Sequence, residues 1–197
     1  MKEEGLDALN FRSLGARPEL DITGTAPLYY FGSKVGLLGA VAEQGFGEVA
    51  ARLRDVRSKA TPGMEAIVSV SIAYAQFGLE NPRLYQAIHT AELWHSAVAD
   101  TGASKRDWVK AARDARDRAF VEFRRAVSEA QNAGALNRTP TDVAAQAMTA
   151  LVDGYLFQAL EENVDADHTL EKRLEYVARL VAVILNGLAG PNALIPE

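Results

Sequence analysis

Apolar residues recur at helical spacing along most of the chain from Ser33 onward. A clear case is the stripe formed by Ile67, Val70, Tyr74 and Phe77, which would face a core on one side of a helix. The alternation of apolar and polar residues that is typical of strands is not found between these runs. The pattern predicts an all-α chain with helices at residues 34–59, 62–79, 82–99, 105–133, 140–163 and 168–188.

Oxygen-bearing capping residues, several of them followed by proline, mark the expected helix starts. Such side chains accept hydrogen bonds from the first backbone N–H groups of a helix, and proline fits its first turn. The residues concerned are Ser33, Thr61 with Pro62, Asn81 with Pro82, Ser104 with Asp107, Thr139 with Pro140, and Asp167.

The two predicted C-terminal helices, 140–163 and 168–188, have unusually broad apolar faces. In the last one, Leu180, Val183 and Leu185 widen the main stripe well beyond a single seam. Such a helix needs cover on more than one side, so it is either central in the fold or half of a dimer interface. We predict a homodimer built mainly from these two helices.

The predicted helix 34–59 contains four glycines in an otherwise regular apolar pattern. Gly36, Gly39, Gly45 and Gly47 each cost about 1 kcal/mol relative to alanine. The stability of this helix must therefore come from packing, and we expect it to be the element that shifts or bends.

Composition narrows the class of protein only modestly. The chain has 197 residues, 48% of them hydrophobic, a formal net charge of -5 and no cysteine. These values exclude disulfides and thiolate metal sites, and no apolar run reaches the roughly 20 residues of a membrane helix. A cytoplasmic location and no membrane partner are expected.

Residues 5–34 carry short motifs in a fixed order. Gly5 to Leu9 and Phe11 to Ala16 precede a turn region, and a Leu28-Tyr29…Phe31-Gly32-Ser33-Lys34 string follows it. This order resembles the DNA-binding end of the TetR family of transcription regulators. The resemblance implies a helix-turn-helix DNA-binding domain at residues 1–34, completed by the start of helix 34–59, and a helical ligand-binding and dimerisation domain at 35–197. It also implies that the DNA-contacting residues are Thr23, Thr25, Tyr29, Tyr30 and Lys34, whereas a simpler interpretation makes Tyr29 and Phe31 plain core.

The DNA-binding end departs from the family pattern. Met1 stands near the end of the expected first helix, and Pro27 falls where the reading helix should run. Residues 1–34 contain four basic side chains, from Lys2, Arg12, Arg17 and Lys34, against five acidic ones, from Glu3, Glu4, Asp7, Glu19 and Asp21. Because phosphate neutralisation drives nonspecific affinity, we expect weak DNA binding by this chain.

Aromatic and polar residues in the larger domain are candidates for a ligand cavity between helices. They are Tyr74, Phe77, Trp94, His95, Trp108, Phe123, Met148 and Tyr155. Core packing explains any single one of them. Buried indole or imidazole nitrogens would need partners, which a ligand or Asp153 would supply. The expected ligand is a small apolar effector with one or two polar groups.

Enzyme and metal functions are not indicated. His89 and His95 are not at metal-ligand spacing, and no glycine-bounded nucleophile surrounds Ser96. We expect no catalytic residue, cofactor or metal. The resemblance implies a homodimeric repressor that binds a palindromic operator and is released by its effector. The alternative is a dimeric helical small-molecule-binding protein that has lost DNA readout.

Overall fold

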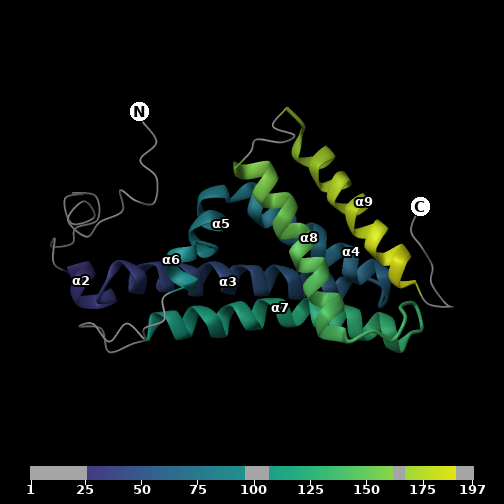
Figure 1. The fold of residues 1–197 in the computed structure, drawn as a ribbon, viewed down its shortest axis with the longest axis horizontal. Helices are drawn as coiled ribbons and strands as arrows, with labels where there is room; N and C mark the ends of the chain where they lie inside the picture. Colours follow the sequence, from purple (N-terminus) through teal and green to yellow (C-terminus); the bar gives the residue numbers. More distant parts are fainter. Residues whose placement is uncertain (1–25, 96–106, 162–166, 190–197) are drawn as a thin grey trace. The chain divides into compact units, whose positions relative to one another are not determined.

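Eight helices account for nearly all of the part of the chain that the structure, a computed structural model, describes, namely residues 26–95, 107–161 and 167–189 (Figure 1). They are α2 (Ala26–Phe31), α3 (Lys34–Lys59), α4 (Met64–Glu80), α5 (Pro82–Ile88), α6 (Ala91–Trp94), α7 (Trp108–Asn132), α8 (Thr141–Glu161) and α9 (Leu170–Leu188). The all-α prediction is confirmed for the described residues. The predicted spans of α3, α4, α7, α8 and α9 agree with the structure to within three residues at each end that is described.

The predicted helix 82–99 is wrong as a single element. The chain forms α5, leaves helical geometry at Thr90, whose ψ is 135°, and re-enters a helix as α6. The indole N–H of Trp94 donates to the carbonyl oxygen of Ile88 at 2.8 Å. That carbonyl would accept a backbone N–H in an unbroken helix, so the side-chain bond compensates for the break.

Capping confirms some predicted helix starts and corrects others. The Ser33 hydroxyl accepts from Gly36 N at 3.0 Å, and an Asp107 carboxylate oxygen accepts from Lys110 N at 2.8 Å. Helix α9 is capped by Thr169 rather than by Asp167. Asn81 closes the end of α4, because both its backbone and side-chain N–H groups donate to Phe77 O.

The chain divides into two units, and α3 and α7 each contribute residues to both. The first unit contains residues up to Gly47 and Arg83–Arg116, and the second contains Glu48–Pro82 and the chain from Asp117 onward. The functional division predicted at residue 34 is a different kind of boundary and stays a prediction.

In the first unit, glycines in α3 permit close approach of neighbouring segments. A Cβ atom at Gly36 would lie 1.9 Å from Phe31 O, and one at Gly39 would lie 2.8 Å from the backbone carbonyl of Trp108. At Gly45 it would lie 3.0 Å from a methyl of Ile88. Three of the four glycines are therefore explained by packing contacts that a side chain would disturb.

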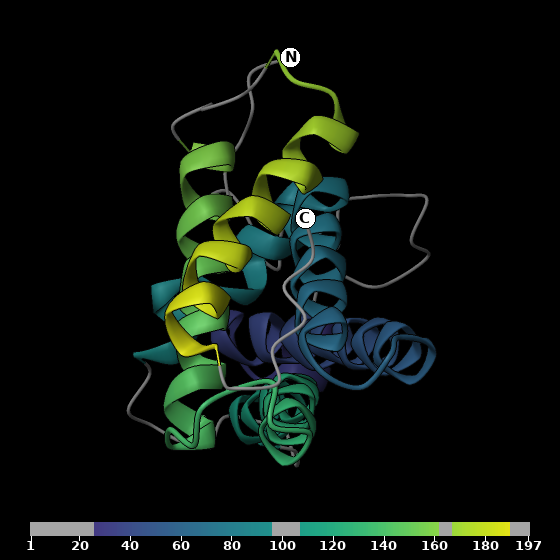
Figure 2. The same cartoon turned by 90° about the vertical axis from the view of Figure 1, so that its right-hand side faces the viewer.

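In the second unit, α4 is the central helix and packs against both α8 and α9 (Figures 1 and 2). The predicted stripe of Ile67, Val70, Tyr74 and Phe77 is fully buried. Helix α9 buries only Val177, Val181 and Leu185. The sequence left open whether this helix is central in the fold or half of a dimer interface, and its limited burial excludes the central position. No described helix is long and apolar enough to cross a membrane.

Candidate functional sites

The predicted DNA-contacting residues lie at the junction of α2 and α3, as far as the structure describes them. Thr23 and Thr25 fall outside the described residues. Tyr29 and Tyr30 are 77% and 63% exposed on α2, and Lys34 is the first residue of α3. Pro27 occupies the first turn of α2, where its missing N–H leaves no helical bond unmade, so it does not prevent this short helix.

The turn between the two helices has a defined geometry. Gly32 adopts φ 79°, which a residue with a side chain rarely reaches, and Ser33 then caps α3. Together these two residues end α2 and begin α3, and Tyr29 is exposed on α2. Among the described residues Tyr29 is exposed and Phe31 is partly covered, and the choice between a DNA contact and a core position stays a prediction for both.

Trp108 packs against the aromatic residues at the end of α2. Its ring lies 5.9 Å from the Tyr30 ring and 5.6 Å from the Phe31 ring, measured between centroids. Its backbone meets Gly39, and its side chain lies near Gly36. Trp108, which the sequence suggested as a ligand residue, thus holds the end of α2 in the structure.

Of the other predicted ligand residues in the first unit, Trp94 has its own partners and His95 is exposed. The Arg116 guanidinium lies 5.1 Å from the Trp94 ring centroid, and Phe46 meets the same ring at 6.0 Å. The indole N–H is taken by Ile88 O. Packing with protein groups accounts for Trp94 without a ligand.

Four of the predicted ligand residues lie in the core of the second unit, each with at most 1% of its surface exposed: Tyr74, Phe77, Phe123 and Met148. The Tyr74 hydroxyl donates to Asp153 Oδ1 at 2.7 Å, so Asp153 serves a tyrosine rather than an indole. The Tyr74 ring also meets Phe123 edge-on, with centroids 6.1 Å apart. These four residues belong to the core in the structure, and their role as ligand contacts stays a prediction.

Tyr155, the last predicted ligand residue, lines a hollow of about 390 Å³ in the second unit. Six further residues of α8, α9 and the segment preceding α9 complete the lining: Gln158, His168, Lys172, Glu175, Tyr176 and Arg179. Sequence reasoning missed all six. The available signal was the spacing of 172, 175, 176 and 179, which places mostly polar side chains on one face of a helix.

Helices α8 and α9 each expose a second apolar stripe beside the one they bury. On α8 it runs through Val143, Ala147, Ala150, Gly154 and Phe157, and on α9 through Tyr176, Leu180, Val183 and Gly187. Steps of three and four residues separate neighbours in both stripes, which is the spacing of helices that pack along their length. Phe157 is 57% exposed and Val183 is 70% exposed.

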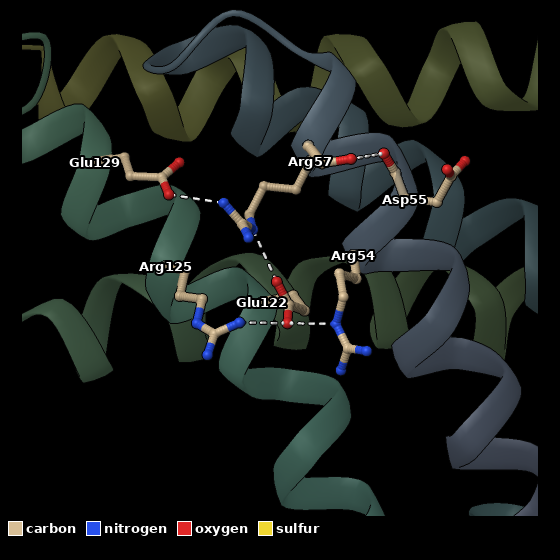
Figure 3. A network of polar contacts seen from close by, with 7 residues as sticks. Arg54, Asp55, Arg57, Glu122, Arg125 and Glu129 are labelled. Atoms are coloured by element: carbon tan, nitrogen blue, oxygen red, sulfur yellow. Dashed lines mark hydrogen bonds and ion pairs between the residues drawn. The ribbon is translucent and has the colours of Figure 1, made fainter.

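A buried carboxylate joins α3 to α7 within the second unit. Glu122 has no exposed side-chain surface, and Arg57 Nε donates to it at 2.8 Å (Figure 3). Arg125 Nη1 reaches it at 2.9 Å and Arg54 Nε at 3.5 Å. The hydrogen bond to Glu122, followed by the charge of Glu129, holds the pKa of Arg57 above its ordinary value against the effect of burial.

Among the described residues, no group of His, Asp and Glu side chains could hold a metal ion.

No protein-family model and no curated protein sequence matches the chain. Nine chains of solved structures match it in fold. A protein with unknown function from Rhodococcus sp. RHA1 is 22% identical, with a TM-score of 0.69 over 95% of this chain and 88% of that one. A bacterial regulatory protein in the tetR family from Rhodococcus RHA1 is 19% identical, with a TM-score of 0.69 over 95% of this chain and 90% of that one. The chain therefore has a TetR-like, all-α fold.

Proposed function

We propose that the chain is a ligand-responsive transcriptional regulator of the TetR family that binds a palindromic operator as a homodimer. The observation that carries the proposal is the TetR-like fold together with the α2–α3 junction, where exposed Tyr29 and Tyr30 precede the capped start of α3. Aromatic hydroxyls and a lysine at a helix start suit contacts with DNA phosphates, which position a reading helix on the duplex. No catalytic step is assigned to the chain, and its proposed location is the cytoplasm.

The proposed dimer forms through the exposed stripes of α8 and α9. These stripes contain no charged side chain, and they include Phe157 and Val183, which water would otherwise cover. A second copy presents the same two stripes, so a twofold arrangement would bury all four helices together. The dimer would hold two reading ends at a separation that fits successive major grooves.

Regulation follows if an effector binds one arrangement of the dimer better than the other. The shift can be no larger than the difference between the effector's affinities for the two states. In the repressor form of the proposal, the effector favours the state that fits the operator poorly, and the DNA is released.

A DNA shift assay with the duplex flanking the chain's own gene tests the proposal. Binding should be specific over an unrelated duplex. It should weaken by about tenfold when Tyr29→Ala removes an exposed side chain of α2, or when Lys34→Gln removes a phosphate contact, each contact being worth about 1–2 kcal/mol. Lys59→Gln, at the exposed far end of α3, is the matched control and should bind as the unaltered chain does.

The alternative is a dimeric helical small-molecule-binding protein without DNA readout. The observation that favours it is the excess of acidic over basic residues in positions 1–34. A chain that dimerises but shows no preference for its flanking DNA at low salt would support this alternative and contradict regulation by direct binding.

A further inference from the structure

The hollow between α8 and α9 differs in chemistry from the apolar core around Tyr74. Its volume of about 390 Å³ lies near the lower end of the range for small-molecule pockets, roughly 300–1,000 Å³. All seven lining residues carry a polar or ionisable group, and two of them, Tyr155 and Tyr176, also bring aromatic rings. The space therefore suits a small molecule that is polar at one end.

The charged groups around the hollow favour an anion. Two basic side chains, Lys172 and Arg179, line it against a single acidic one, Glu175. The Arg179 guanidinium donates to Glu175, one helical turn away. Within the described residues, the Lys172 ammonium forms no ion pair, so its charge is available to a ligand.

The two tyrosines favour a flat ligand. The rings of Tyr155 and Tyr176 lie 5.8 Å apart between centroids with their planes inclined at 51°. Rings so arranged present apolar faces and edges on which another ring packs in an offset or edge-on geometry. Gln158 and Glu175 add a donor and acceptors for polar substituents of that ring.

We propose that this hollow is a binding site for small planar carboxylates, such as a benzoate-sized ring acid. The Lys172 ammonium pairs with the carboxylate, while the rings of Tyr155 and Tyr176 pack against the ligand ring. Tyr176 also belongs to the exposed stripe of α9, so the bound acid lies beside the proposed dimer contact. The assignment of this acid as the effector rests on the proposed function, whereas the binding itself does not.

Isothermal titration calorimetry of the full chain, without DNA, tests the site with probes that separate charge from shape. Benzoate has both the ring and the carboxylate, and acetate has the carboxylate without the ring. Benzamide keeps the ring but replaces the carboxylate with a neutral amide, and inorganic phosphate is an anion with neither a ring nor a carboxylate. Benzoate should bind at least about tenfold more tightly than the other three, because a charge-assisted hydrogen bond and a ring contact each contribute.

Variants then locate the site. Lys172→Gln should weaken benzoate binding by about tenfold or more, and Arg138→Gln, which removes the same charge from an exposed residue outside the hollow, should leave it unchanged. Melting curves followed by circular dichroism establish that both variants are folded.

Several results would overturn the proposal. Equal binding of benzoate and benzamide would contradict the role of Lys172, and equal binding of benzoate with acetate or phosphate would contradict recognition of a ring. If Lys172→Gln and Arg138→Gln changed benzoate binding equally, the binding site would not be the hollow. If benzoate did not bind at millimolar concentration, the hollow would not be a site for such acids. The DNA assay is run without benzoate, so either proposal can fail while the other stands.

Discussion

Glu122 shows how a single side chain can determine the alignment of two helices. A carboxylate with no exposed surface is costly in free energy unless basic groups surround it, and here arginines from α3 and α7 do so. Any sliding of one helix along the other would separate the buried carboxylate from Arg57 and Arg54, its two partners on α3. The cluster therefore favours one register of α3 on α7 within the second unit.

Glu122→Gln is expected to destabilise the chain by about 2–4 kcal/mol, because it leaves Arg57 facing a neutral amide in a buried setting. Glu129→Gln is the matched control. Glu129 is 36% exposed, and its loss should cost less than about 1 kcal/mol. Urea unfolding followed by circular dichroism measures both, and equal losses would show that burial of Glu122 does not decide the effect.

Glu80 should contribute a pH-dependent share of stability. The hydrogen bond from Arg52, followed by that from Gln76, holds the pKa of Glu80 below its ordinary value of 4.5. The folded chain thus binds this proton less readily than the unfolded chain does, so the contribution is present above pH 4.5 and is lost as the pH falls through the lowered pKa. Glu80→Gln should flatten the acid side of a plot of unfolding free energy against pH.

Glu65 supplies the comparison for Glu80. It is an exposed carboxylate on the same helix, and it has no ion pair among the described residues. Glu65→Gln should reproduce the acid side of the unaltered chain. A flattening as large as that of Glu80→Gln would mean that general charge, and not the Arg52 pair, causes the dependence.

Among the helices, sequence periodicity predicted the long ones well because caps and apolar spacing act locally. The bounds of α3 were predicted to the residue, with Ser33 as the capping residue before its start. The break between α5 and α6 was not predicted, because it depends on the indole of Trp94 reaching back to Ile88. Local patterns cannot show that a side chain will replace a helical hydrogen bond.

The sequence also did not predict which of the apolar helices would be buried most completely. Helices α4 and α9 are both rich in apolar residues, yet α4 is buried around most of its circumference and α9 on one side only. Which helix becomes central depends on contacts across the unit, such as Gly78 against Leu156, where a Cβ atom would lie 2.7 Å from a methyl. The polar face of the hollow was missed for the same reason, since its members come from two helices and the segment preceding α9.

The contrast between Gly39 and Gly47 separates packing from helix propensity within α3. Gly39→Ala should destabilise the chain by about 1–3 kcal/mol, because its Cβ atom would meet the backbone of Trp108 at 2.8 Å. Gly47→Ala places a methyl where no atom beyond the adjoining backbone of α3 lies within 4 Å, and should stabilise the chain by about 0.5–1 kcal/mol. Thermal unfolding of the two variants provides the comparison, and stabilisation by both would show that α3 and Trp108 are not held in close contact.

For the molecule as a whole, the exposed stripes of α8 and α9 predict the oligomeric state. Val183→Glu should convert the proposed dimer to a monomer, because a carboxylate buried in an apolar interface without a partner costs several kcal/mol. Its buried neighbour Val181 would be an unsuitable probe, since it belongs to the core of a single chain.

Light scattering gives the molar mass of each form. Ala51→Glu is the control, because it adds the same charge at an exposed position of α3, outside the two stripes. A Val183→Glu chain that keeps the mass of a dimer would show that α8 and α9 do not meet a second copy through these stripes.

The placement of the two tryptophans gives the first unit an optical signal that the second unit does not share. Trp94 and Trp108 are the only tryptophans of the chain, and both belong to the first unit, one against Phe46 and the other behind Tyr30 and Phe31. Tryptophan emission therefore follows the surroundings of α2 and α6 in the first unit, whereas tyrosines occur in both units and include Tyr155 and Tyr176 beside the hollow. A molecule that binds in the hollow should alter the tyrosine spectrum directly, and any accompanying change in tryptophan emission would measure how far its effect travels along the chain.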